Sequence, residues 1–251
     1  MYRVSKVLNN NGVIAIDMDE NKEYVILGKG VGFGKKVSQR FDKPEGCTTY
    51  RLEQETERGS AKELVKGIEP EYLEIADAIL TESQKVFGDS IDRGILFPLA
   101  DHISFAVARI RRNEQISNPL TEDIKVLFYS EFKVAETLKT ILRERLQIEI
   151  DDHEVGYVAL HIHSAIGDEK VSVAMQTARA VRECIDMIEK ATGKPIDVLS
   201  LSYNRLMNHM KYMVARASTG EKLNLDMNEY MLDQYPQAYE IAADICKNLE
   251  G

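Results

Sequence analysis

An eleven-residue pattern that occurs twice limits the fold of this chain more than any other feature. LADHISFAVAR begins at Leu99 and LMNHMKYMVAR begins at Leu206, and the two share L-x-x-H-x-x-[FY]-x-V-A-R. The same offset aligns apolar and aromatic positions of residues 128–138 with those of residues 235–245. A fixed offset that is kept over separate segments is the mark of tandem structural units. The sequence therefore predicts two homologous modules.

The residues before these modules follow a different period. YRVSKVL, GVIAID and KEYVILG are rich in β-branched and aromatic residues and are separated by the turn-forming runs NNN and DMDEN. From Pro70 onward the apolar residues recur at helical spacing, as they do in residues 121–147. We predict a small N-terminal all-β antiparallel domain, folded as a meander and followed by two all-α helical-bundle modules. So small a β domain buries little apolar surface, which favours a self-paired dimer.

Composition and repeat alignment together give the expected boundaries. We expect the β domain in residues 1–56, a polar linker in 57–67, the first module in 68–169 and the second in 170–251. Gly251 aligns with Glu144 of the first copy, which continues with DDHEVGYVALHIHSAI. The second module is therefore expected to lack its last helix. Whether the chain is truncated or naturally shortened stays open.

Charge and cysteine usage exclude several classes of protein. The net charge is −9, but residues 1–56 carry nine Lys and Arg against eight Asp and Glu, so the acidic excess lies in the modules. Three cysteines stand far apart in no C-x-x-C pair, which argues against a disulfide framework and a thiolate metal site. No apolar run of membrane-spanning length and no signal peptide is present, so we expect a cytoplasmic protein.

A glycine-rich run, GKGVGFGKK at residues 28–36, has the composition of a phosphate-binding loop. Its spacing does not fit the P-loop pattern, because Lys29 stands five residues before Gly34 and Val37 follows the lysine pair. The G-x-G-x-x-G dinucleotide pattern fails from Gly28 and from Gly30. Composition alone leaves two interpretations: the glycines shape a twisted hairpin with solvated lysines, or they let a ligand approach the backbone.

The five histidines include one pair at equivalent positions of the repeat. His102 and His209 each border an apolar stripe of their predicted helix, which places the imidazole near an edge. His161 is predicted on the apolar face of a later helix, whereas His153 and His163 are expected to be ordinary surface residues.

That later helix starts with a capping-box arrangement, in which Asp151 is followed three residues later by Glu154. His161 and His163 point about 200° apart on a helix, so they cannot bind one metal ion together.

The chain shows neither a nucleophile elbow nor a paired-carboxylate motif, which argues against an enzyme. A histidine can instead accept a phosphoryl group, which adds roughly two negative charges near neutral pH.

Longer stretches of the chain resemble the transcription antiterminators of the BglG/SacY/LicT type. KVLNNNGVIAI and KEYVILGKGVGFGKK resemble the co-antiterminator RNA-binding domain of that family. FPLADHISFAVAR, GYVALHIH and LSYNRLMNHMKYMVAR are similar to its paired PTS regulation domains. The resemblance implies an RNA-binding antiterminator that stabilises a hairpin in leader mRNA and is regulated by histidine phosphorylation from the sugar phosphotransferase system.

The resemblance also implies particular residues and partners. The implied RNA contacts are Lys6, Asn9, Asn10, Asn11, Gly28, Lys29, Gly30 and Phe33. The glycines would admit nucleic acid to the backbone, Lys29 would contact phosphate and Phe33 would stack on an unpaired base. The implied phosphorylation sites are His102, His161 and His209. No metal and no cofactor is implied.

The implied partners are the leader mRNA hairpin, the phosphocarrier HPr, a PTS sugar permease and a second copy of the chain. Two other hypotheses stay open at this point. One is a phosphorylation-sensing regulator whose β domain binds a protein partner, and the other is a histidine-dependent hydrolase.

Overall fold

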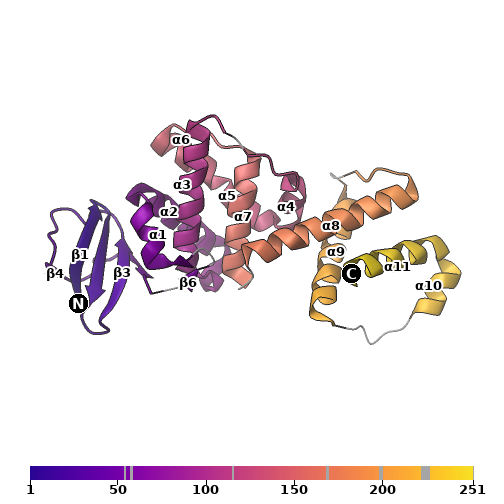
Figure 1. The fold of residues 1–251 in the computed structure, drawn as a ribbon, viewed down its shortest axis with the longest axis horizontal. Helices are drawn as coiled ribbons and strands as arrows, with labels where there is room; N and C mark the ends of the chain where they lie inside the picture. Colours follow the sequence, from indigo (N-terminus) through magenta and orange to yellow (C-terminus); the bar gives the residue numbers. More distant parts are fainter. Residues whose placement is uncertain are drawn as a thin grey trace. The chain divides into compact units, whose positions relative to one another are not determined.

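The computed structural model of the chain describes residues 1–53, 55–56, 59–114, 116–167, 170–197, 200–221 and 227–250. Within these residues the chain forms two compact units. The first unit consists of Met1–Ser117 and Ser130–Lys170, and the second of Asn118–Tyr129 and Val171–Gly251. Figure 1 traces the chain from the indigo sheet at the N-terminus to the yellow helices at the C-terminus.

The first unit begins with a five-stranded antiparallel sheet of order β4-β1-β2-β3-β5. Its central strands are β1 (Tyr2–Asn9), β2 (Gly12–Asp17) and β3 (Lys22–Leu27), and they form the predicted meander. The edge strands β4 (Arg40–Phe41) and β5 (Thr48–Arg51) were not predicted, because segments this short show no alternation of polar and apolar residues. The core of the sheet is formed by Val4, Val13, Ala15, Ile26, Val31, Phe41 and Cys47.

A short ladder of β6 (Glu55–Thr56) and β7 (Gly59–Ser60) leads into helix α1 (Ala61–Gly67). This helix lies in the segment that the polar composition marked as a linker. Ala61 and Val65 are its buried residues, which is too few to give a periodic signal in the sequence.

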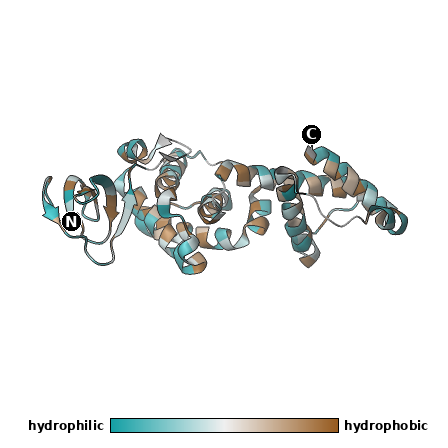
Figure 2. Cartoon of the chain, turned by 90° about the horizontal axis from the view of Figure 1, so that it is seen from below, coloured by the Kyte–Doolittle hydropathy of each residue, from teal (hydrophilic) through white to brown (hydrophobic). Residues whose placement is uncertain are grey.

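The first unit continues with helices on the β3–β5 side of the sheet (Figure 1). They are α2 (Pro70–Phe87), η1 (Gly88–Ser90), η2 (Arg93–Ile95), α3 (Leu96–Arg111), α5 (Tyr129–Ala135), α6 (Thr137–Leu146) and α7 (Asp152–Gly167). Brown and teal alternate along the helical ribbons in Figure 2, as expected for helices that bury one face and expose the other. An N-terminal antiparallel sheet followed by helices confirms the predicted fold class.

The second unit contains α4 (Thr121–Leu127), α8 (Val171–Thr192), α9 (Leu201–Thr219), α10 (Asn228–Gln234) and α11 (Pro236–Glu250). Its largest fully buried side chain is Tyr203, whose hydroxyl donates a hydrogen bond to Asp123 Oδ1 over 3.1 Å. Burial raises the pKa of Asp123, while the contacts with Tyr203 and Arg182 oppose that shift. Arg182 Nη1 lies 3.7 Å from the same carboxylate oxygen.

The internal repeat extends to details of the backbone. Helix α4 (Thr121–Leu127) and helix α10 (Asn228–Gln234) occupy equivalent positions of the two copies. Both helices end in the same way, since Phe128 has φ −123° and ψ 47° and Tyr235 has φ −139° and ψ 56°. Among the described residues no helix is long and apolar enough to cross a membrane.

Replacing Tyr203 by phenylalanine should lower the stability of the second unit by about 1 to 3 kcal/mol, because Asp123 loses its buried hydroxyl donor. Hydrogen exchange of the α9 amides measures this change. Tyr212→Phe is the matched control, since Tyr212 lies on the same helix and is 63% exposed. Equal exchange rates in the two variants would contradict the assigned role of Tyr203.

Candidate RNA-binding surface and histidine cluster

Two loops that are separate in sequence form one surface at the end of the sheet. The Asn11 carbonyl accepts a hydrogen bond from the Gly28 N–H over 2.9 Å, and the Asn10 carbonyl accepts one from the Gly32 N–H over 3.0 Å. The side chain of Asn11 accepts a third from the Gly30 N–H, over 3.0 Å. The turn between β1 and β2 therefore holds the glycine-rich loop after β3. All of the asparagines and glycines implied as RNA contacts lie here.

The glycines of this loop serve two different purposes. A Cβ on Gly32 would lie 2.0 Å from the Asn9 carbonyl oxygen, and one on Gly28 would lie 2.4 Å from Cys47 Sγ. At these two positions a side chain would clash with its neighbours, so packing requires glycine. Gly30 and Gly34 have φ of +75° and +67° and face open space. The backbone at Gly30 and Gly34 is thus open to a ligand.

The side chains of the loop separate into an anchor and an exposed tip. Val31 is buried in the sheet core, whereas Phe33 is 74% exposed. Lys29 in the same loop, Asn10 in the β1–β2 turn and Lys6 within strand β1 are exposed as well. An exposed aromatic ring among lysines and backbone amides combines the groups that bind unpaired nucleotides.

The histidines predicted on two different helices lie next to each other in the first unit. His102 on α3 and His161 on α7 have ring centroids 5.4 Å apart. They are only 8% and 7% exposed, so His102 is buried rather than placed at an edge as predicted.

A carboxylate that the sequence assigned to helix capping belongs to this cluster. Asp151 Oδ1 does accept the Glu154 N–H at the start of α7, over 3.2 Å. The Glu154 side chain, however, faces α3, where Oε2 lies 3.4 Å from His102 Nε2 and Oε1 accepts a hydrogen bond from Arg109 over 2.8 Å. Burial alone would raise the pKa of Glu154, but the contacts with His102 and Arg109 outweigh it and lower that pKa. A buried anion thus stands beside His102.

The remaining histidines differ from these two. His163 was expected to be a surface residue, and this is wrong, because its Nδ1 lies 2.8 Å from Glu131 Oε1 with both side chains only 14% exposed. His209 is exposed on α9, although it occupies the repeat position of the buried His102. No group of His, Cys, Asp and Glu that could hold a metal ion occurs in the part of the chain described above.

Comparison with protein families defines the class of this chain. Residues 2–59 match the CAT RNA binding domain, and residues 77–165 and 182–251 match the PRD domain. The chain belongs to the family of transcription antiterminators in which a CAT RNA-binding domain precedes PRD domains. This is a class of RNA-binding regulators and not of enzymes, and it confirms the resemblance found in the sequence.

Individual relatives are similar over almost the whole chain. The GlcA/glcB genes antiterminator of Staphylococcus carnosus (strain TM300) is 30% identical over 99% of this chain and 88% of its own length. The transcription antiterminator LicT of Bacillus subtilis (strain 168) is 25% identical over 99% of this chain and 89% of its own. The crystal structure of GlcT CAT-PRDI matches with a TM-score of 0.57 and 29% identity, over 66% of this chain and 98% of that one.

Glu154→Gln should destabilise the first unit by about 1 to 3 kcal/mol at pH 7, because the charge-assisted contacts of a buried carboxylate are lost. A carboxylate whose pKa is lower in the folded state stabilises the fold above its unfolded pKa of about 4.3, and this contribution disappears as the pH falls through the folded pKa. The difference between variant and wild type should therefore shrink below about pH 4. Thermal unfolding followed by circular dichroism as a function of pH measures it.

Glu144→Gln, which removes an exposed carboxylate of α6, is the control and should have little effect at any pH. A Glu154→Gln difference that stays constant from pH 7 to pH 3 would contradict an ionised, paired Glu154.

Proposed function

We propose that this protein is a transcription antiterminator that binds a hairpin in leader mRNA through the surface formed by its two loops. The proposed RNA contacts are Lys6, Asn9, Asn10, Asn11, Gly28, Lys29, Gly30 and Phe33. The observation that carries this proposal is the set of hydrogen bonds that joins the asparagine turn to the glycine loop, with Phe33 exposed at the tip. Membership of the CAT family supports it.

The distribution of charge supports RNA binding at this end of the chain. Residues 1–56 carry one net positive charge, so the net charge of −9 arises entirely from the rest of the chain. The acidic modules repel phosphate, whereas lysines of the loop surface displace counterions from RNA. Binding should therefore be local to the sheet and should weaken with salt.

We also propose that the helical modules regulate RNA binding through phosphorylation of His102, His161 and His209. HPr and a PTS sugar permease are the proposed phosphoryl donors and partners, and PRD domains as a class are targets of this system. A phosphoryl group on His102 would place roughly two negative charges beside the buried Glu154 carboxylate. Arg109 Nη2 forms an ion pair with Glu154 Oε1 over 2.8 Å, and the added charge would compete with Glu154 for this cation. Phosphorylation would thus disrupt the existing ion pair and change the packing of α3 on α7.

We also propose a domain organisation and a homodimeric state. We assign the RNA-binding domain to residues 1–56, the connecting segment to 57–67, and the regulatory modules to 68–169 and 170–251. The protein would act in the cytoplasm as a homodimer, because two sheets related by a two-fold axis form one composite RNA surface. If the β domain binds a protein partner in place of RNA, no hairpin will be retained by the full chain.

Phe33→Ala should weaken binding of an RNA hairpin by about 1 to 3 kcal/mol, since a stacked base loses its aromatic partner. The hairpin is obtained by selection from a randomised stem-loop library with the full chain, and its Kd is measured by fluorescence anisotropy at several salt concentrations. Val37→Ala is the control, because Val37 is 64% exposed and lies outside the proposed contacts. An unchanged Kd for a folded Phe33→Ala chain would remove Phe33 from the site.

Incubation of the full chain with phosphoenolpyruvate, enzyme I, HPr and a sugar permease should label His102 and His161. Acid-labile phosphate is mapped by mass spectrometry, and the dimer mass and the RNA affinity are followed in parallel. His102→Ala and His161→Ala should each lose one label, whereas His153→Ala should lose none. Labelling that spares both histidines in an active system, or that leaves dimer and RNA binding intact, would refute the proposed switch.

A further inference from the structure

Within the first unit, the edge strand β5 is joined to the first long helix of the regulatory module by a partly buried polar node. Tyr50 on β5 is 3% exposed and hydrogen bonds to the Asp77 carboxylate of α2. The Arg93 guanidinium donates to both partners, to the Tyr50 hydroxyl over 2.7 Å and to Asp77 Oδ1 over 2.8 Å. Three groups that hydrogen bond to one another at a partly buried contact fix α2 against this edge of the sheet.

One turn earlier on α2, a second carboxylate reaches the asparagine turn. Residues three apart on a helix share a face. Glu74 therefore lies on the same face of α2 as Asp77 and faces the β1–β2 turn. Asn9 Nδ2 donates to Glu74 Oε1 over 2.6 Å, and Asn11 Nδ2 donates to Glu74 Oε2 over 3.2 Å. The carboxylate thus accepts one hydrogen bond on each oxygen.

The orientation of both asparagine amides follows from their other hydrogen bonds. Asn9 Oδ1 accepts the Asn11 N–H over 2.9 Å, and Asn11 Oδ1 accepts the Gly30 N–H over 3.0 Å. Because each amide oxygen is already used inside the loops, each NH2 group is left as an outward donor. Two adjacent donors that converge on one point form a site for an anion with two acceptor oxygens.

The same pair of donors suits an RNA phosphate. Asparagine side chains are among the groups that bind phosphate oxygens in nucleic-acid complexes. A carboxylate and a phosphate cannot occupy one pair of N–H donors together. Glu74 also has a second partner on its other side, Arg145 Nη1 at 3.7 Å, which would remain with it after the loops leave.

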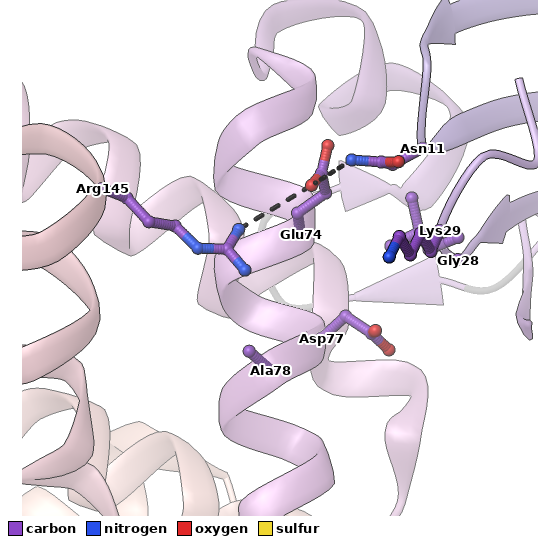
Figure 3. A pocket seen from close by; sticks show the side chains of 8 residues that line it. Asn11, Gly28, Lys29, Glu74, Asp77, Ala78 and Arg145 are labelled. Carbon is purple, nitrogen blue, oxygen red and sulfur yellow. Dashed lines mark hydrogen bonds and ion pairs between the residues drawn. The ribbon is translucent and has the colours of Figure 1, made fainter. Parts of the chain in front are cut away.

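Figure 3 shows the cavity that lies between α2 and the loop surface. A cavity of about 460 Å³ is lined by Asn11, Gly28 and Lys29 of the loops and by Glu74, Asp77 and Arg145 of the helices. Asn11 points at Glu74, and Arg145 approaches Glu74 from the opposite side (Figure 3). Gly30 and Phe33 remain exposed. The helix therefore covers one side of the proposed RNA site and leaves its aromatic tip open.

We propose that the Glu74 face of α2 is a binding surface for the RNA-contacting loops of this protein, and that its carboxylate competes with an RNA phosphate for Asn9 and Asn11. The inference rests on the proposed RNA site and adds the group that occupies part of it. RNA binds only after the asparagine turn leaves α2. If about nine chains in ten hold the Glu74 contact, the apparent affinity for RNA is about tenfold lower than that of a free loop surface.

The test uses the full chain with Glu74→Ala and Glu74→Gln. Glu82→Gln is the matched control, because it removes a carboxylate two turns further along α2, where Glu82 pairs with Lys85 on the surface. The first measurement is hydrogen exchange without RNA. Amides of residues 9–12 and 28–32 should exchange several-fold faster in Glu74→Ala than in the wild type or in Glu82→Gln. Unchanged exchange would show that α2 does not hold the loops and would overturn the proposal.

The second measurement is the Kd for the hairpin selected with the wild-type chain. Glu74→Ala should bind about tenfold more tightly, with the gain mainly in the association rate, and Glu82→Gln should bind as the wild type does. Equal affinity of Glu74→Ala and wild type, or an equal gain in Glu82→Gln, would overturn competition while leaving RNA binding in place. If selection with the wild type and with both Glu74 variants yields no hairpin that binds, the proposed function is overturned, and the competition with it.

Discussion

Asn11 is the point on which the loop surface depends. Its carbonyl accepts a hydrogen bond from the Gly28 N–H, and its side-chain oxygen accepts one from the Gly30 N–H. Its side-chain nitrogen donates to Glu74 of the neighbouring helix. One residue thus shapes the glycine loop and connects it to the regulatory module. The loop needs these bonds, because its positive-φ glycines have little preference of their own for one conformation. The same asparagine is therefore a structural residue and a proposed ligand for RNA.

The histidine cluster and the RNA loops are connected through packed helices of the first unit. Helix α2, which carries Glu74, packs against α3, which carries His102, and α3 packs against α7, which carries His161 and Glu154. Buried side chains at these contacts are closely packed, so we expect a charge added at His102 to shift a helix. Such a shift acts on the helix that holds the asparagine turn. Phosphorylation of His102 would then have a direct physical route to the proposed RNA site, in addition to any change in dimer pairing.

The sequence allowed the elements with strong periodicity to be predicted. Alternation defined β1, β2 and β3, and the repeated histidine motif defined α3 and α9, whereas the two-residue strand β4 and helix α1 gave too few periodic positions. The site was only partly predictable. His102 and His161 were each predicted as phosphorylation sites, but their contact depends on how α3 packs on α7. Glu154 was assigned to capping because its spacing from Asp151 fits that motif, and Glu74 is one of many acidic residues on an amphipathic helix, so no local pattern distinguishes it.

The central claim is that the asparagine turn and the glycine loop together form the RNA site, and photochemical cross-linking tests it most directly. The full chain is irradiated with a selected hairpin that carries photoreactive nucleotides, and the modified peptides are identified by mass spectrometry. The account predicts cross-links in residues 9–11 and 28–36, with Phe33 among the modified residues. Cross-links confined to the helices after residue 60, with none in either loop, would contradict it.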